Sequence, residues 1–239
     1  MQLGKQYDDN RYRGGPRPLL KAFPVTYDQG LFSREMKMPL LLELFSGTGS
    51  IGRAFEAQGW EVISVDIDPR SNATFCCDVL EWDCSCLETV DCIWASPPCT
   101  FYSKARTTGC SADLESADSL VRKTLDIAAA LGNPPLFIEN PRTGKLRTRG
   151  LLDHLSLQTV DYCKYGMPYR KRTAIWTNTA WIPVQALCKH DCPSSTNGKH
   201  LATAQQGGPG PRFTQRELYR IPSKLCEAIA AYCTHEPVA

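Results

Sequence analysis

LLLELFSGTGSIGRAFEAQGWEVISVDID, residues 40–68, decides the fold. Its apolar start, LLLELF, predicts a strand, the glycines of SGTGS predict a turn, and IGRAFEAQ has the apolar spacing of a helix that ends at Gly59. WEVISVDID then predicts a second strand, which ends in the carboxylates Asp66 and Asp68. The order strand, glycine turn, helix, strand indicates a parallel unit of an α/β protein.

The same alternation continues toward the C-terminus. An apolar strand, VDCIWAS, stops at two prolines, and residues 116–131 have helical spacing that ends at Gly132-Asn133-Pro134. Further strands are predicted at PLFIEN, LQTVDYC and RTAIWTN, and further helices at FTQRELYR and PSKLCEAIAAYC. The predicted fold class is therefore α/β, a doubly wound and mostly parallel Rossmann-like sheet with a small irregular insert, whose ligands bind beyond the carboxyl ends of the strands.

Changes in amino-acid composition and pattern along the chain predict three parts. Residues 1–38 mix glycine, proline and charge and read as an irregular arm, with a few apolar anchors such as Leu19, Leu20 and Phe23. Residues 39–178 and 213–239 carry the regular pattern and form the main domain. Residues 179–212 contain cysteines, histidines and a glycine-proline tract and form a small insert.

Composition limits the classes of protein to consider. The 27 Lys and Arg residues nearly balance the 25 Asp and Glu residues, so any nucleic-acid surface must be a local patch. No apolar run reaches the length of a membrane span, and the N-terminus lacks a secretory signal. We therefore expect a monomer with no membrane partner that is not secreted and stays in the cytoplasm, or in the nucleus of a eukaryote. Its 12 cysteines are then expected to be reduced.

Glycines and carboxylates at the strand ends form a candidate nucleotide site. Gly47 and Gly49 let backbone amides approach a ligand closely, and the following helix start favours negative groups. Asp66 stands where a ribose needs an acceptor, and Asp78 could accept from an adenine amino group. The alternative is that these residues only form turns.

LELFSGTGSIGRAFEAQGWEVISVDID as a whole resembles the first two motifs of the cytosine-5 DNA methyltransferases, with Glu43 where that family commonly has Asp. The resemblance implies a short form of these enzymes with a reduced target-recognition region, in which residues 39–178 and 213–239 are the catalytic domain and residues 179–212 the recognition insert. The cofactor implied is S-adenosylmethionine, bound by Phe45, Gly47, Thr48, Gly49, Asp66, Ile67, Asp78, Val79 and Pro97.

WASPPCTFYS places a cysteine after two prolines at a strand end, where the prolines restrict the loop and hold the thiol in a fixed position. The alternative is a buried cysteine that packs beside a turn. The family's fourth motif is Pro-Cys in this setting, and its sixth is matched by Glu139-Asn140-Pro141. The resemblance implies a catalytic group of Cys99, Glu139, Asn140 and Pro98.

The chemistry of cytosine C5 requires such a pair, because C5 does not attack a methyl donor while the ring is aromatic. A thiolate that adds at C6 activates C5, and a carboxyl group at N3 stabilises the charge that reaches the ring. The implied activity is methylation of C5 of a cytosine that has been flipped out of double-stranded DNA. Two alternatives remain open: methylation of RNA, as in a related branch that modifies a transfer RNA, and an inactive DNA-binding module.

A basic segment over residues 142–172 is the candidate phosphate surface, although such runs are often only solvated faces. YGMPYRKRT resembles the family's eighth motif imperfectly: aligned without gaps, Lys171 replaces its first Arg and Thr173 its second, whereas a shift of one residue would use Arg170 and Arg172. The nucleic-acid contacts implied are Ser103, Arg142, Arg170, Lys171 and Arg172.

The insert has a cysteine and histidine spacing compatible with a structural Zn²⁺ site. Cys188, Cys192 and His200 are the first candidates, with Cys163 as a fourth ligand and His190 as a competitor. Reduced cysteines in a loop are the alternative, because the spacing fits no standard zinc finger. For the other group, Cys76, Cys77, Cys84 and Cys86, we predict an apolar role and no metal.

Overall fold

The computed structural model describes residues 37–103, 111–206 and 210–235. The predicted N-terminal arm lies outside these ranges, except for its last two residues. Within the described ranges, no helix is long and apolar enough to cross a membrane. The division of the rest into a catalytic domain and an insert stays a prediction.

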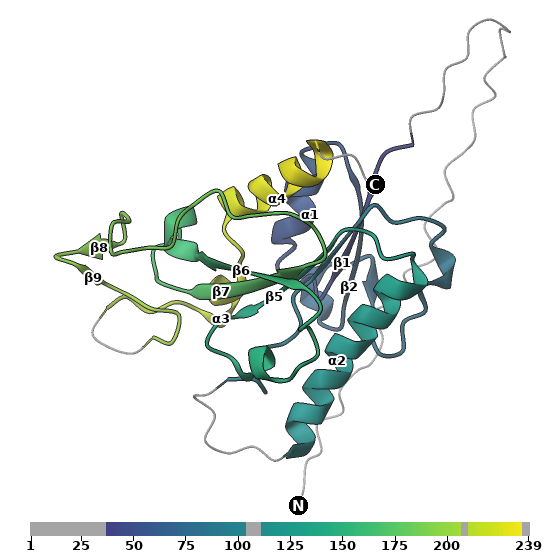
Figure 1. Ribbon diagram of the computed structural model, residues 1–239, viewed down its shortest axis with the longest axis horizontal. Coiled ribbons are helices and arrows are strands. Elements are labelled where there is room, and N and C mark those ends of the chain that lie inside the picture. The colour runs from purple at the N-terminus through teal and green to yellow at the C-terminus, as the bar shows by residue number, and fades with distance from the viewer. Residues whose placement is uncertain (1–36, 104–110, 207–209, 236–239) are drawn as a thin grey trace, which may run out of the picture. The chain divides into compact units, whose positions relative to one another are not determined.

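A seven-stranded sheet forms the centre of the fold, with the strand order β3-β2-β1-β4-β5-β7-β6 (Figure 1). The strands are β1 (Leu40–Leu44), β2 (Glu61–Asp66), β3 (Phe75–Cys76), β4 (Cys92–Ala95), β5 (Leu136–Pro141), β6 (Ser156–Asp161) and β7 (Arg172–Thr177). Neighbouring strands from β3 to β5 are parallel, and β7 is antiparallel to both β5 and β6. The connection from β6 to β7 is short, which suits an antiparallel pair, whereas parallel neighbours need a long crossover.

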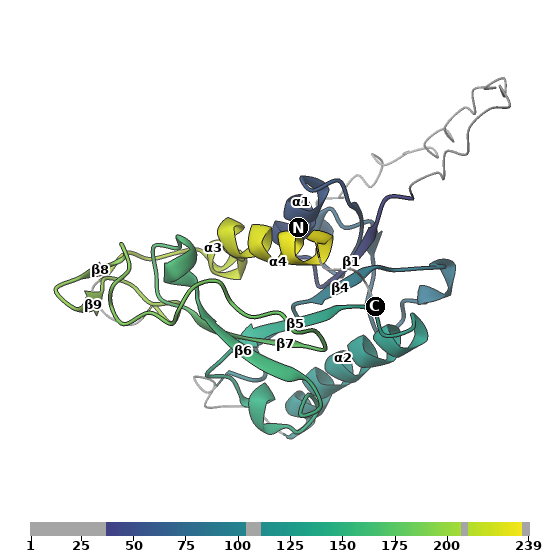
Figure 2. The same ribbon diagram turned by 45° about the horizontal axis from the view of Figure 1, so that its top comes forward.

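Helices cover both faces of the sheet. Figure 2 shows α1 (Ser50–Glu56) and α4 (Ser223–His235) on one side and α2 (Ser111–Ala130) on the other. A fourth helix, α3 (Gln215–Tyr219), precedes α4. Four short 3-10 segments complete the helical structure: η1 (Pro69–Ser71), η2 (Cys84–Cys86), η3 (Lys145–Thr148) and η4 (Tyr162–Tyr165).

β1 shows why this sequence folds into a covered sheet, because all five of its residues are buried. Leu41 packs in the hydrophobic cluster that contains Phe55 of α1 and Leu225 of α4. Leu42 packs in the opposite cluster, with Val121 of α2. A strand buried on both faces reads as a continuous apolar run, as LLLEL does. The expected α/β fold, mostly parallel, is thus confirmed.

The insert has little regular structure. Its only described strands are β8 (Ser195–Thr196) and β9 (Lys199–His200), which form a hairpin that projects away from the large sheet (Figure 1). Asn197 and Gly198, with φ of 50° and 71°, make the tight turn, a position that favours Asn-Gly.

The prediction for the second cysteine group is correct for two members and wrong for two. Cys77 and Cys84 pack against the hydrophobic core, whereas Cys76 and Cys86 are exposed. Cys76 faces solvent because β3 is a two-residue edge strand whose other side chain, Phe75, packs on the core. Cys86 lies at the end of η2, on which Cys84 is the residue that packs against the core.

Candidate active site

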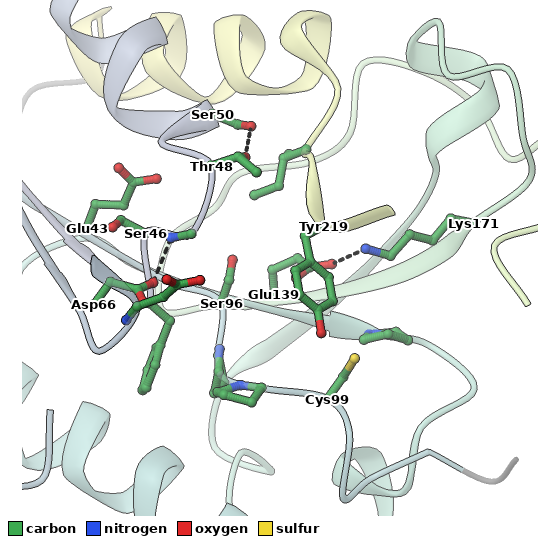
Figure 3. A pocket seen from close by; sticks show the side chains of 17 residues that line it. Glu43, Ser46, Thr48, Ser50, Asp66, Ser96, Cys99, Glu139, Lys171 and Tyr219 are labelled. Atoms are coloured by element: carbon green, nitrogen blue, oxygen red, sulfur yellow. Dashed lines mark hydrogen bonds and ion pairs between the residues drawn. The ribbon is translucent and has the colours of Figure 1, made fainter. Parts of the chain in front are cut away.

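A cavity of about 220 Å³ opens beyond the carboxyl ends of β1, β4 and β5 (Figure 3). In an open α/β sheet this is the edge at which ligands bind. Nine residues predicted from the sequence line it, namely Phe45, Gly47, Thr48, Asp66, Pro97, Pro98, Cys99, Glu139 and Lys171. The structure therefore brings the glycine turn, the candidate nucleophile and the candidate carboxyl group to one space.

The glycine turn after β1 has a left-handed backbone conformation at three of its residues, which glycine adopts most readily. Phe45, Gly47 and Gly49 all have left-handed φ values, of 56°, 50° and 62°. The carboxylate of Asp66 orders this turn, because its Oδ2 accepts a hydrogen bond from the Gly47 amide at 2.7 Å and its Oδ1 accepts from the Asp68 amide at 2.7 Å. Asp66 thus fixes the turn and at the same time faces the cavity (Figure 3).

Glu43 is a buried acid in the wall of the cavity, with only 3% of its surface exposed. Its Oε2 accepts a hydrogen bond from the Gly52 amide at 3.2 Å, which ties β1 to α1. Burial raises the pKa of Glu43 to about 7, against the smaller opposing effect of the Gly52 hydrogen bond. Near neutral pH this carboxyl group is therefore close to its point of ionisation.

Replacing Glu43 with glutamine is expected to stabilise the fold at pH 8 by about 3 kcal/mol and to have little effect near pH 4.5. The pKa is raised in the folded state, so the wild-type side chain carries no penalty below its ordinary pKa of 4.5, loses stability as pH rises from there, and carries the full penalty above about 7. Urea unfolding at both pH values measures the difference. Glu61→Gln, at an exposed position of β2, is the control and should show no such pH dependence. A Glu43→Gln effect equal at both pH values would contradict the assignment.

Two contacts fix the loop that carries Cys99. Upstream of the thiol, Asn140 Nδ2 donates to the Pro97 carbonyl oxygen at 2.9 Å. Downstream, the buried Tyr102 hydroxyl donates to Asp118 Oδ1 of α2 at 2.9 Å. The two prolines restrict the backbone between them. The thiol of the half-buried Cys99 is thereby held at the cavity wall.

Glu139, at the end of β5, faces the same cavity (Figure 3). Its Oε1 accepts a hydrogen bond from the Tyr162 hydroxyl at 2.9 Å and lies 3.7 Å from Lys171 Nζ. Lys171 is held in turn by the Leu218 carbonyl oxygen at 3.3 Å and lies 4.8 Å above the ring of Tyr162. The carboxyl group is thus oriented by a hydroxyl and a cation before any ligand is present.

The charges in the cavity act on the Cys99 thiol in opposite directions. Burial is the largest cause that raises the pKa of Cys99, and the negative charge of Glu139 raises it further. The positive charge of Lys171 lowers the pKa of the thiol, with a smaller effect. The thiol form is favoured while Glu139 is ionised, so a change in the charge of Glu139 changes the nucleophilicity of Cys99.

Other residues predicted for the cofactor or the catalytic group lie outside the cavity wall or have a different contact. Asn140 is fully buried, with Oδ1 unpaired within the described part of the chain, and positions Pro97. Ile67 is 68% exposed, and Val79 is buried in the core. Asp78 accepts a hydrogen bond from the Leu80 amide at 2.9 Å. Gly49 forms the N-terminal boundary of α1.

The predicted nucleic-acid contacts separate into different environments. Lys171 lies inside the cavity, and Arg172 forms a two-pronged ion pair with the buried Asp161, at 2.9 and 2.7 Å. Arg170 pairs through its backbone with Ala202 and Ala204 of the insert. Arg142 and Ser103 are half-buried. The phosphate role of all five residues stays a prediction.

The sequence did not single out three groups that the structure places at the site. Tyr162 reaches Glu139 from the end of β6, and Tyr219 lines the cavity with its hydroxyl pointing toward Cys99 (Figure 3). Ser46 lines the cavity with a buried hydroxyl that has no partner within the described ranges. Tyr219 lies in the predicted helix FTQRELYR, and Ser46 lies within the glycine turn. For Tyr162 the sequence holds no signal.

The predicted metal ligands also come together. The ligand atoms of Cys163, Cys188, Cys192 and His200 all lie within 4.8 Å of one another. His190, the competing candidate, is not in this group, although its ring centroid lies 4.9 Å from that of His200.

Comparison with curated proteins finds a clear relative. The chain is 32% identical over 217 residues to the "Probable DNA (cytosine-5)-methyltransferase" of Frog virus 3 (isolate Goorha), a match that covers 81% of this chain and 99% of the relative. The chain belongs to the cytosine-5 methyltransferase family. No protein-family model matches it.

Two solved structures align with only part of this cytosine-5 methyltransferase. A mutant of DNMT2 from Spodoptera frugiperda aligns with a TM-score of 0.45 and 19% identity over 62% of this chain and 54% of that chain. The methyltransferase EhMeth of Entamoeba histolytica aligns with a TM-score of 0.47 and 17% identity over 65% and 59%. The present chain thus spans little more than half the length of either structure.

The cavity of this cytosine-5 methyltransferase fits S-adenosylmethionine, the cofactor of the family. Its glycine-turn end presents the carboxylate of Asp66, that of Asp68, which is paired with Arg70 at 2.8 Å, and the hydroxyl of Ser46, which has no partner among the described residues. Carboxylates are suitable acceptors for ribose hydroxyls and complement the positive charge of a sulfonium. The acidic end lies beside Pro97 and Pro98, which lead to Cys99, so a methyl donor bound there would border the nucleophile.

Proposed function

We propose that this enzyme methylates C5 of cytosine in DNA, with Cys99 as the covalent nucleophile. The observation that carries this proposal is the shared cavity, in which the Cys99 thiol and the Glu139 carboxyl group lie beside the glycine turn. This arrangement supplies a nucleophile, a group to bind N3 and room for a methyl donor in one place.

Cys99 performs the first step. Its thiolate adds to C6 of the cytosine, and the electron pair of the C5–C6 double bond moves to C5, which becomes nucleophilic. The loop of residues 97–102 is held by the contacts of Asn140 and Tyr102, which limit the positions of the sulfur. Less conformational freedom therefore has to be lost before attack.

Glu139 acts on the opposite side of the ring by holding a proton at N3. A proton shared with N3 reduces the negative charge that arrives on the ring. It also removes the charge of Glu139 that raises the pKa of Cys99, so thiolate formation and binding of N3 favour each other. Tyr162 and Lys171 orient the carboxyl group for this role.

S-adenosylmethionine, when bound, supplies the electrophilic methyl group that C5 accepts. We propose that Phe45, Gly47, Thr48, Gly49, Asp66, Ile67, Asp78, Val79 and Pro97 hold this cofactor, as the family pattern implies. Loss of the C5 proton and elimination of the Cys99 thiolate then restore the aromatic ring and free the enzyme.

One observation favours DNA as the substrate, and a second favours a nucleic acid in general. The viral relative carries a DNA methyltransferase name and matches over nearly its whole length. Next to the cavity residue Pro141, positive charges gather: Arg147 and Arg172 lower the pKa of the Arg142 guanidinium, after burial as the largest cause. Such a cluster suits the phosphate backbone of DNA and of RNA alike. In duplex DNA the target base must leave the stack to reach Cys99.

Methyl transfer to DNA is the direct test. The full chain is incubated with labelled S-adenosylmethionine and double-stranded DNA of mixed sequence, and the digested product is analysed by mass spectrometry. We expect 5-methyldeoxycytidine, because only C5 is activated by addition at C6. Poly(dA)·poly(dT), which lacks cytosine, is the matched control and should remain unlabelled.

The same assay with total RNA distinguishes the alternatives. Labelled 5-methylcytidine in RNA without any label in DNA would overturn the DNA assignment and leave the mechanism in place. No transfer to any cytosine, from protein that binds S-adenosylmethionine, would identify an inactive module.

A further inference from the structure

Away from the cavity, three thiols and one imidazole converge on one point of the structure. Cys188 Sγ lies 3.5 Å from His200 Nε2, and Cys192 Sγ lies 3.3 Å from it. Tetrahedral Zn²⁺ with its usual bond lengths to sulfur and nitrogen places such atoms about 3.6 Å apart. Cys163 completes a group whose ligand atoms are all within 4.8 Å of one another. The two distances to His200 are thus close to the edge of a zinc tetrahedron, and the group as a whole is compact enough to close around one ion.

We propose that Cys163, Cys188, Cys192 and His200 bind a structural Zn²⁺ ion. Thiolate and imidazole are the donors that favour zinc over hard cations such as Mg²⁺ and Ca²⁺. All three cysteines are buried and unoxidised, and His200 is half-buried. Four protein ligands leave no open position, which is the pattern of a structural rather than a catalytic zinc site.

The insert needs such a link because it has little apolar core. The three cysteines form a hydrophobic cluster of their own, separate from the two that cover the sheet. Nearby apolar side chains such as Ile182, Val184 and Leu201 are exposed. A segment that cannot bury apolar surface is commonly stabilised by a metal, whose binding energy becomes folding energy.

Polar contacts bring the insert to the ligand Cys163. Ser194 Oγ donates to the Met167 carbonyl oxygen at 2.8 Å, and Lys164 pairs with Asp191 at 3.0 Å. These contacts hold Cys163, on η4, beside the hairpin that carries His200. The metal would join two segments that these contacts already hold close together.

This metal would also position the catalytic carboxyl group, an extension that rests on the function proposed for Glu139. Three consecutive residues make the connection: Asp161 accepts from the Cys188 amide at 3.0 Å, Tyr162 donates to Glu139 at 2.9 Å, and Cys163 is the metal ligand. The chain that bears Tyr162 is therefore fixed on both sides by the insert.

Zinc content tests the metal site directly. The full chain, purified from zinc-containing medium, is analysed by inductively coupled plasma mass spectrometry, and about one ion per chain is expected. Cys192→Ser should lose the ion. Cys86→Ser, which removes an exposed cysteine outside the cluster, is the matched control and should retain it. Wild-type protein without zinc, or equal zinc in both variants, would overturn the site.

Cobalt substitution covers the case in which Cys192→Ser does not fold. Wild-type protein reconstituted with Co²⁺ should show the visible bands of tetrahedral coordination and thiolate-to-cobalt charge transfer. Octahedral bands without charge transfer would rule out three thiolate ligands.

Methyl transfer by zinc-depleted protein tests the connection to Glu139. We expect a fall on the order of 10-fold to 100-fold, since small displacements of a catalytic group have effects of this size. Folded, depleted protein with full transfer would refute the connection and leave the metal site standing. Zinc-loaded wild-type protein without any transfer would instead refute the proposed function.

Discussion

Cys99→Ala abolishes methyl transfer and leaves S-adenosylmethionine binding unchanged: this is the expected result with the largest effect. Without the thiolate, C6 receives no nucleophile and C5 stays aromatic, so the rate should fall by roughly 10⁴-fold or more. The cofactor end of the cavity is lined by other residues, among them Ser46, Gly47 and Asp66, which the substitution does not touch. Labelled methyl transfer and isothermal titration with S-adenosylmethionine measure the two effects.

A trapped adduct tests the covalent step itself. In the presence of S-adenosylmethionine, DNA that contains 5-fluorocytosine should remain attached to the wild-type chain. Once C5 carries both the methyl group and fluorine, it has no proton to lose, so elimination of the thiol is blocked. The adduct should survive denaturing electrophoresis and be absent from Cys99→Ala. Cys84→Ala, which removes another half-buried cysteine outside the cavity, should still form it. An adduct in Cys99→Ala would place the nucleophile elsewhere.

Glu139→Gln is expected to slow methyl transfer and to make the Cys99 thiol more reactive. Methyl transfer should fall by roughly 10²-fold to 10⁴-fold, because glutamine cannot hold a proton at N3. The pKa of Cys99 should also fall, because the charge that helps to raise it is gone while Lys171 still lowers it. Alkylation of Cys99 by iodoacetamide should therefore become faster near neutral pH, although the enzyme becomes slower.

The pH profile of this alkylation provides the measurement. Peptide mass spectrometry follows the labelling of Cys99, and its midpoint should lie at lower pH in Glu139→Gln than in the wild type. Glu88→Gln, at an exposed position away from the cavity, should leave the midpoint unchanged. A midpoint that rises in Glu139→Gln would show that the carboxyl group stabilises the thiolate, contrary to the geometry.

Local patterns were sufficient to predict the sheet and one side of the site. The apolar run of β1, the glycines and the strand-end carboxylates act within a few residues, so their roles can be read from consecutive letters. The position of Cys99 beside Glu139 could also be expected, because carboxyl ends of neighbouring parallel strands meet at one edge.

Strand register explains what could not be predicted around Lys171. Arg172 pairs with Asp161 across β6 and β7, while its neighbour Lys171 faces Glu139. Successive side chains of an extended chain point to opposite sides, so a shift of one residue exchanges their environments. The imperfect eighth motif allowed both registers, and only the strand pairing selects one.

The contact of Tyr162 with Glu139 was beyond sequence reasoning for a related reason. These residues are 23 positions apart in the sequence. Glu139 lies on β5 and Tyr162 follows β6, and the two meet across β7, which lies between these strands in the sheet. An inserted strand of reversed direction leaves no local signature in the letters of its neighbours. The metal ligands were easier to predict, because Cys188, Cys192 and His200 are close in sequence and of a recognisable type.

The buried amide of Asn140 has a mechanical consequence for catalysis. By bonding to the Pro97 carbonyl oxygen, it couples the loop of the nucleophile to the strand end that carries its carboxyl partner. This hydrogen bond restricts changes in the separation of the two groups, so an incoming base meets a nucleophile and a carboxyl group at a preset spacing.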